Sequence, residues 1–188
     1  MVVAGDQTPG WLTGVDNVQV DRKSGRFDDA EANVRAGLAR VAGWAYIFHD
    51  DMVVARPVRW IAPANRGLLS SYRSGGAYYQ RARQVDGWLR TQISRPAVNF
   101  NVHLPFLVTA GRYLELTDVK LPTGFGLSVY GNLMGLRTRT VVDPKVTTPG
   151  SRPHPSWPVW SMSDRSFRSG LIGRMVRDLY PRPGPYEK

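Results

Sequence analysis

The sequence predicts an α+β fold in which helices pack against an antiparallel sheet formed by about residues 98–142. Two observations support this prediction. Apolar and polar residues alternate along residues 98–104, which is the pattern of a half-buried strand. In three other segments, near residues 28–48, 77–94 and 164–180, apolar residues recur at helical spacing.

Residues 1–25 are rich in glycine and polar residues, yet they also contain Trp11 and several valines. A freely solvated tail does not need such apolar side chains, so we expect an extended arm that lies on another surface. Asp28 and Glu31 have the spacing of a capping box and indicate where the first helix begins.

A basic amphipathic helix is predicted over residues 77–94, with its arginines away from the apolar stripe. Pro96 follows soon afterwards and is a stop signal for this helix. Before it, residues 52–61 have the composition of a short strand. Because Pro57 interrupts this strand, we expect it at a sheet edge.

Three more strands complete the predicted sheet. They are placed at residues 112–120, 125–130 and 136–142. Pro122 and Gly124 lie between the first two and are typical turn residues. This block carries few charges, so we expect it to form the surface on which the arginine-rich helices pack.

A belt of proline and tryptophan follows at residues 143–163. It contains five prolines beside Trp157 and Trp160, a composition that we do not expect to form a β-ladder and that is too aromatic for an idle linker. The predicted organisation is an arm at 1–25, a single core domain at 26–142, the belt at 143–163, and a C-terminal helix and tail at 164–188.

The formal net charge is +10, and only four of the 25 basic residues are lysine. Arginine suits bidentate contacts to phosphate and carboxylate groups. A GC-rich genome, whose codons favour arginine, glycine, alanine, valine and proline, explains the bias equally well. Residues 1–51 hold five basic and eight acidic side chains, whereas residues 52–188 hold twenty and seven. Such asymmetry indicates a polyanion-facing side, or subunits that meet acidic end to basic end.

The candidate contact residues are arginines on predicted helices and tryptophans in the arm and belt. The candidate contacts to a polyanion or a partner are Arg73, Arg81, Arg83, Arg90, Arg165, Arg168, Arg174 and Arg177. The candidate inter-subunit anchors are Trp11, Trp157 and Trp160. Around residues 72–90 the arginines alternate with tyrosines, as in surfaces that stack bases and bind phosphates. The alternative interpretation is a solvated helix face beside a buried aromatic stripe.

Little in the sequence indicates catalysis. The chain has no cysteine, which excludes a disulfide, a thiolate nucleophile and a cysteine-ligated metal. His49, Asp50 and Asp51 are the one place where a histidine meets carboxylates, but a metal site would need further histidines and only His103 and His154 remain. A phosphate loop, a dinucleotide fingerprint and a nucleophile elbow are absent. We expect no cofactor, no metal and no catalytic residue.

These observations favour a non-enzymatic structural subunit of a large assembly, most plausibly a virus or bacteriophage particle. Its partners would be copies of itself and other subunits, and nucleic acid in addition if the arginines face it. The expected location is the virion, after assembly in the host cytoplasm. No apolar run approaches the length of a membrane span, so no membrane partner is expected. The alternatives are a stand-alone nucleic-acid-binding protein and a metal-dependent enzyme centred on His49, Asp50 and Asp51.

Overall fold

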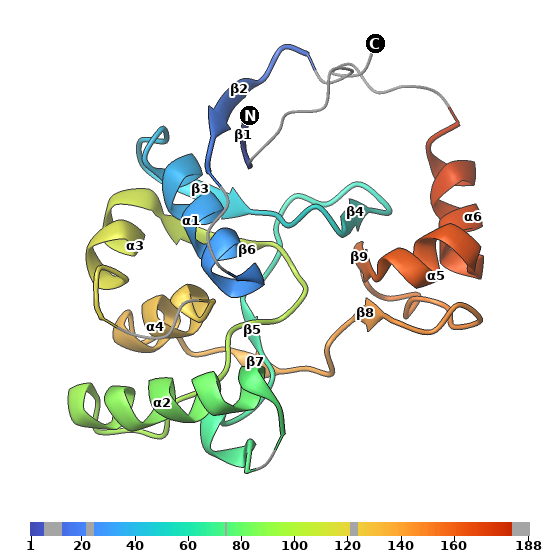
Figure 1. The fold of residues 1–188 in the computed structure, drawn as a ribbon. Helices are drawn as coiled ribbons and strands as arrows, with labels where there is room; N and C mark the ends of the chain where they lie inside the picture. Colours follow the sequence, from blue (N-terminus) through green and yellow to red (C-terminus); the bar gives the residue numbers. More distant parts are fainter. Residues whose placement is uncertain (6–12, 22–24, 74, 121–123, 182–188) are drawn as a thin grey trace.

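The computed structural model of the protein describes residues 1–5, 13–21, 25–73, 75–120 and 124–181 (Figure 1). The fold is α+β, as predicted. The helices are α1 Arg26–Leu38, α2 Ala77–Gln92, α3 Ala110–Leu116, α4 Gly126–Leu133, α5 Asp164–Ser169 and α6 Leu171–Leu179, and a short 3-10 turn is η1 Leu69–Ser71. The strands are β1 Val2–Gly5, β2 Asp16–Gln19, β3 Trp44–Ile47, β4 Met52–Val54, β5 Ala64–Asn65, β6 Phe106–Thr109, β7 Arg139–Thr140, β8 Lys145–Val146 and β9 Val159–Met162.

Within the described residues the strands form several small sheets. Two of them, β1–β2 and β5–β7, are parallel pairs, and β3 pairs antiparallel with β6. The three-stranded sheet has the order β4–β9–β8, in which β4–β9 is antiparallel and β8–β9 is parallel. In Figure 1, α5 and α6 lie on one side of the molecule and α1 to α4 on the other. One antiparallel sheet over residues 98–142 was therefore a wrong prediction.

Residues 98–104 are not part of a ladder, although their alternation is real. Phe100, Val102 and Leu104 are buried as predicted. However, the N–H of Val102 donates to the carbonyl of Phe100, and the N–H of Leu104 to that of Val102. These successive three-residue γ-turns use backbone groups that a neighbouring strand would need. A single bridge, from Val98 to Leu68, is the sheet-like contact that this segment makes among the described residues.

The strands predicted at 112–120 and 125–130 are largely helical instead, as α3 and α4. Every residue of α4 up to Asn132 is buried, so its apolar residues face neighbours on all sides. A short, uniformly apolar run has no periodicity that separates a buried helix from a buried strand. Of the strand predicted at 136–142, the two residues of β7 are in a strand.

The first predicted helix, 28–48, is shorter than expected. Helix α1 ends at Leu38, and the chain then turns through Gly43, whose φ of +79° favours glycine. Residues 44–47 form β3. Helix α1 begins after Gly25 without a side-chain cap, so Asp28 and Glu31 do not form the predicted capping box.

The helix predicted at 77–94 is confirmed as α2, whereas the one at 164–180 is broken at Gly170 into α5 and α6. Gly170 has extended backbone, and the N–H of Leu171 donates to the carbonyl of Pro149. A Cβ at position 170 would lie 2.6 Å from that same carbonyl oxygen. Such a Cβ would lie even closer to the carbonyl oxygen of Ser166, so both carbonyl groups explain the glycine, and the hydrogen bond to Pro149 accompanies the interruption.

The arm and the belt both contain strands. In the arm, β1 packs beside α1, where the Cβ of Ala4 lies 3.5 Å from the position of a Cβ on Gly37. In the belt, β8 and β9 pair in a ladder, contrary to our expectation that this segment forms none. The pairing is possible because the prolines of the belt lie outside both strands. The edge strand predicted within 52–61 is confirmed as β4, and Pro57 follows it.

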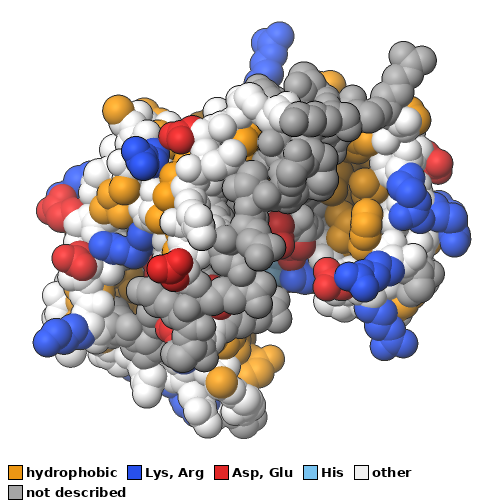
Figure 2. All heavy atoms as spheres, turned by 45° about the horizontal axis from the view of Figure 1, so that its top comes forward, with side chains coloured by type: hydrophobic (Ala, Val, Ile, Leu, Met, Phe, Trp, Pro, Cys, Tyr) orange, Lys and Arg blue, Asp and Glu red, His pale blue; other side chains and the backbone are white. Residues whose placement is uncertain are grey.

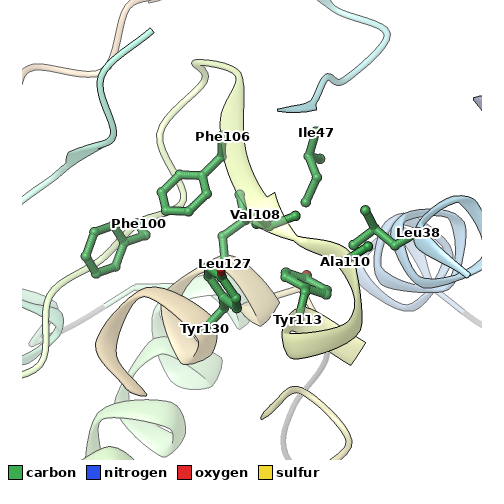
Figure 3. Close-up of a cluster of buried hydrophobic side chains, with 9 residues drawn as sticks. All are labelled: Leu38, Ile47, Phe100, Phe106, Val108, Ala110, Tyr113, Leu127 and Tyr130. Atoms are coloured by element: carbon green, nitrogen blue, oxygen red, sulfur yellow. The ribbon is translucent and has the colours of Figure 1, made fainter. Parts of the chain in front are cut away.

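The largest aromatic cluster of the core joins α1, β3, β6, α3 and α4. Figure 3 shows its side chains, among them Ile47, Phe100, Phe106 and Tyr130, pointing toward one another. A second cluster packs the inner face of α2 against α4 and η1 and thereby fixes the position of α2. No helix in the described part of the chain is both long and apolar enough to cross a membrane.

Candidate functional site

Three of the predicted arginines, Arg73, Arg83 and Arg90, line one groove beside α2. Arg83 and Arg90 are seven residues apart on this helix, which is about two turns or roughly 10 Å along its axis, so they emerge from the same face. Gly87 lies between them on that face, and Tyr72, next to η1, also lines the groove. The groove has a volume of about 510 Å³ and opens widely to solvent.

Gly87 creates the hollow between the two arginines of α2. A Cβ at this position would have no described atom within 4 Å outside its own stretch of helix. A glycine inside a helix costs about 0.5–1 kcal/mol relative to alanine. Packing within the described chain gives no reason for this cost, and the position of Gly87 between Arg83 and Arg90 is the feature that distinguishes it from other exposed glycines such as Gly111.

Tyr72 is held in place by a buried amide. The side-chain Nδ2 of Asn99 donates to the Oη of Tyr72 and to the Oη of Tyr78, both at 2.9 Å, and Asn99 itself is fully buried. The ring of Tyr72 also contacts the exposed ring of Tyr79, with centroids 5.4 Å apart. One side of the groove is therefore formed by the ring of Tyr72, which Asn99 holds in place.

The three arginines leave much of their hydrogen-bonding capacity unused. Arg90 donates through Nε to Asp86 at 2.9 Å, and its side chain is 60% exposed. Arg83 donates through Nη1 to the carbonyl of Tyr72 at 3.4 Å, and Arg73 forms no hydrogen bond or ion pair with another described residue. Asp86 is buried, and its Oδ1 has no donor among the residues described. The groove thus presents three cations against one carboxylate.

Arg81 does not belong to this groove. It projects from another face of α2 toward α1, where its Nη1 lies 3.7 Å from Asp28 Oδ1. Its guanidinium also stacks over the ring of Phe27, 4.9 Å from the ring centroid. The charge asymmetry of the sequence favours a pairing of Arg81 with acidic residues of the first helix in a neighbouring subunit. In the structure this pairing occurs within one chain.

The other four predicted arginines, Arg165, Arg168, Arg174 and Arg177, are exposed on α5 and α6. Figure 2 shows basic side chains gathered on the side of the molecule that these helices occupy in Figure 1. Arg177 stacks over Phe167, 5.8 Å from the ring centroid. These residues lie on the other side of the molecule from α2 in Figure 1, and they line neither the α2 groove nor the hollow of about 280 Å³ lined by Asp143 and Lys145.

Two of the three predicted tryptophan anchors pack on their own chain, and Trp11 lies outside the described residues. Trp157 is half-buried beside the cluster that joins β4, β5 and β9, and Arg139 stacks over its ring at 5.5 Å. Trp160 is half-buried against the cluster that contacts α6. Neither carries the broad exposed area that motivated the prediction, and a contact with a neighbouring subunit stays a prediction.

Sequence reasoning missed a different group of apolar side chains, which we call the aromatic surface. It comprises Trp44, Phe48, Val58 and Trp60, with exposed fractions of 67%, 47%, 36% and 57%. Tyr46 joins them, since its ring centroid lies 6.4 Å from that of Phe48 and 6.2 Å from that of Trp60. Residues 44 and 46 share one face of β3, and residue 48 directly after the strand continues the same alternation. This period of two was the available signal, and it was obscured by the helical spacing assumed through residue 48.

The His49, Asp50 and Asp51 triplet does not assemble as one site. Asp51 Oδ2 accepts from Lys145 Nζ at 2.5 Å, whereas Asp50 is exposed. Burial lowers the pKa of His49, and the nearby Asp51 opposes this effect. Across the described residues, no three His, Asp or Glu side chains come together in an arrangement that could hold a metal ion.

His103 instead forms the centre of a charged network. Its Nδ1 lies 2.8 Å from Asp143 Oδ2, its Nε2 lies 3.3 Å from Lys145 Nζ, and Arg66 Nη1 lies 3.0 Å from Asp143. Burial raises the pKa of Asp143, but the hydrogen bonds and charges of His103 and Arg66 outweigh it and lower that pKa. The network joins four separate segments of the chain and borders a hollow of about 280 Å³.

Comparison with known proteins adds no relative to this description: no protein-family model matches the chain, and neither a curated protein nor a solved structure matches it.

Proposed function

We propose that the protein is a non-enzymatic structural subunit of a large assembly and that the aromatic surface is one of its contact faces. The observation that carries the proposal is the exposure of Trp44 and Trp60, at 67% and 57%. Contiguous exposed apolar side chains of this size mark interaction sites on folded proteins, because each would otherwise order water at a cost in free energy. Aromatic residues are also the ones most enriched in protein interfaces.

The partner we propose for this face is a second copy of the chain. Aromatic side chains bury about 150–250 Å² each, so the aromatic surface supplies a large part of the roughly 800 Å² that each partner contributes to a standard interface. In addition, β3 pairs with β6 on one edge, and no described strand occupies its other edge. A second copy related by two-fold symmetry would match the aromatic surface to itself.

The assembly we propose is a virus or bacteriophage particle, and the location is the virion. Its support is the charge distribution: the acidic first 51 residues and the strongly basic remainder suit a subunit that contacts both neighbouring subunits and a polyanion. Arg81 pairs with Asp28 inside the chain. The arginines of α5 and α6 are exposed and form a basic face that can contact a neighbouring subunit or a polyanion.

Sedimentation velocity over a range of protein concentrations tests this proposal. The unaltered protein should self-associate at micromolar concentration, and the double variant Trp44→Ser/Trp60→Ser should remain monomeric. Val142→Ser is the matched control, since Val142 is 88% exposed but lies outside the aromatic surface. A monomeric unaltered protein at about 100 μM, or equal association of the double variant, would contradict the proposal.

A further inference from the structure

We propose that the groove along α2 binds the sugar–phosphate backbone of a single-stranded nucleic acid. The groove residues are Arg73, Arg83 and Arg90, with Gly87 between the last two and Tyr72 beside them. None of these residues belongs to the aromatic surface, so this inference and the proposed self-association can be tested independently.

The spacing of the arginines favours a ligand that carries negative charges at regular intervals. Arg83 and Arg90 emerge from one helix face with about 10 Å between them along the axis, so their guanidinium groups can contact two different phosphate groups. A polymer with a phosphate at every residue places separate charges near each of them. Arg90 contacts Asp86 through Nε, and its terminal nitrogens bond no other described residue, so they can form a bidentate contact to a ligand.

The shape of the groove provides room for the backbone. Because Gly87 has no side chain, a hollow lies between the two arginines, where any larger residue would reduce the space available. A ligand that lies in this hollow passes both guanidinium groups. This geometry gives the glycine a role that the packing of the chain does not explain.

The tyrosines favour a single strand over a duplex. Tyr72 lines the groove, and Tyr79, which is 38% exposed, lies against it. Unpaired bases stack on aromatic rings of this kind, whereas the bases of a duplex are already stacked and paired. An acidic polypeptide would satisfy the arginines but would gain little from an exposed pair of tyrosine rings.

The first experiment blocks the groove without changing its charge. Binding of a fluorescein-labelled oligothymidylate and an oligouridylate of about 20 nucleotides is measured by fluorescence anisotropy at low salt. Gly87→Leu should weaken binding at least about tenfold, because the new side chain occupies the hollow. Leucine is a good helix former, so circular dichroism and thermal unfolding should show a folded protein. Gly111→Leu on α3 is the matched control, since Gly111 is also exposed with open space, and it should bind as the unaltered protein does.

The second experiment separates this groove from general electrostatic attraction. The triple variant Arg73→Ala/Arg83→Ala/Arg90→Ala should flatten the slope of log affinity against log salt by about 2, or roughly 0.7 for each phosphate of a single strand that an arginine no longer neutralises. The triple variant Arg168→Ala/Arg174→Ala/Arg177→Ala removes the same charge from α5 and α6. It should lower the affinity by a smaller factor and change the slope less.

Three outcomes would overturn the inference. The first is the absence of binding by the unaltered protein at about 50 mM salt. The second is an equal loss in the two triple variants, which would show that total charge and not the groove determines affinity. The third is binding of poly-glutamate as tight as that of the oligonucleotides, with the same loss in Gly87→Leu, which would identify an acidic protein segment as the ligand.

Discussion

At the residue scale, two half-buried carboxylates respond to their surroundings in opposite ways. Glu31 accepts hydrogen bonds from Tyr113 Oη at 3.0 Å and from the N–H of Gly126 at 3.2 Å, but burial outweighs these bonds and raises its pKa. At Asp143 the balance is reversed, because charged partners outweigh burial and lower the pKa. The difference lies in the balance of effects: at Glu31 the hydrogen bonds and the charge of Arg35 lower the pKa by less than burial raises it, whereas at Asp143 the effects of His103 and Arg66 outweigh burial.

These shifts predict opposite effects on stability as pH changes. The pKa of Asp143 is depressed in the folded protein, so its contribution is present above its ordinary value of 3.8 and is lost as pH falls through the folded value. Asp143→Asn should therefore lower the free energy of unfolding by about 1–3 kcal/mol near pH 7. The loss should shrink toward pH 3. Urea denaturation between pH 3 and pH 7 measures both quantities, and a loss that does not depend on pH would contradict the assignment.

Glu31 is the comparison for this measurement. Its folded pKa lies above the ordinary value of 4.5, so the folded protein binds more protons than the unfolded chain between the two values. In that interval Glu31 makes the free energy of unfolding fall as pH rises. Glu31→Gln should remove this decline, whereas Asp143→Asn should leave it in place. The same slope in Glu31→Gln and in the unaltered protein would show that another group causes it.

At the element scale, α1 and α2 are joined within one chain by a contact that the charge asymmetry of the sequence led us to expect between subunits. Arg81 pairs with Asp28 and stacks on Phe27 of α1. Both charged side chains are more than a quarter exposed, at 28% and 27%, so solvent weakens their attraction. We therefore expect a coupling energy of about 0.2–1 kcal/mol.

A double-mutant cycle with Arg81→Ala and Asp28→Ala measures this coupling from urea denaturation of four proteins. The control pair is Arg81→Ala with Asp29→Ala, which tests whether the effect belongs to Asp28 or to the acidic first turn as a whole. Coupling that depends on protein concentration would instead indicate that Arg81 contacts a second copy of the chain.

Periodicity predicted the elements whose burial is one-sided. Helix α2 has a buried stripe of Ala82, Val85 and Leu89 and a polar face, and its sequence pattern identified it within two residues at its C-terminal end. Helix α4 is buried all round, so its apolar run fits a helix and a strand equally well. The break at Gly170 accompanies a hydrogen bond to Pro149, which lies far away in the sequence, and no local pattern contains that information.

The sequence identified the three arginines of the candidate groove, but it did not predict the shape of the groove. Arg83 and Arg90 could be placed on one helix face from their spacing alone. Arg73 reaches the same groove because the chain before α2 folds back along the helix, where Asn99 holds Tyr72. That buried amide lies in a segment that the alternation pattern assigned to a sheet, so its effect on Tyr72 was outside the reach of sequence reasoning.

At the scale of the whole molecule, self-association through the aromatic surface predicts that thermal stability depends on concentration. A partner that binds only the folded chain shifts the unfolding equilibrium, so Tm should rise with protein concentration. Differential scanning calorimetry over about a hundredfold range of concentration measures this rise. The Trp44→Ser/Trp60→Ser variant should show a constant Tm, and Val142→Ser should follow the unaltered protein. A constant Tm in the unaltered protein would contradict the prediction.

The pairing of β4 with β9 has a consequence for the order of events during synthesis. Its register matches Val54 with Val159, and the flanking hydrogen bond from Arg56 to the carbonyl of Ser156 spans 100 residues. At translation rates of about 5–20 residues per second, β4 leaves the ribosome roughly 5–20 s before its partner has been made. The Asp51–Lys145 ion pair spans 94 residues, so it too can form only after the later segment has been made. The segment that carries β4 therefore presents an open strand edge until β9 has been made, in the period when chaperones bind such edges.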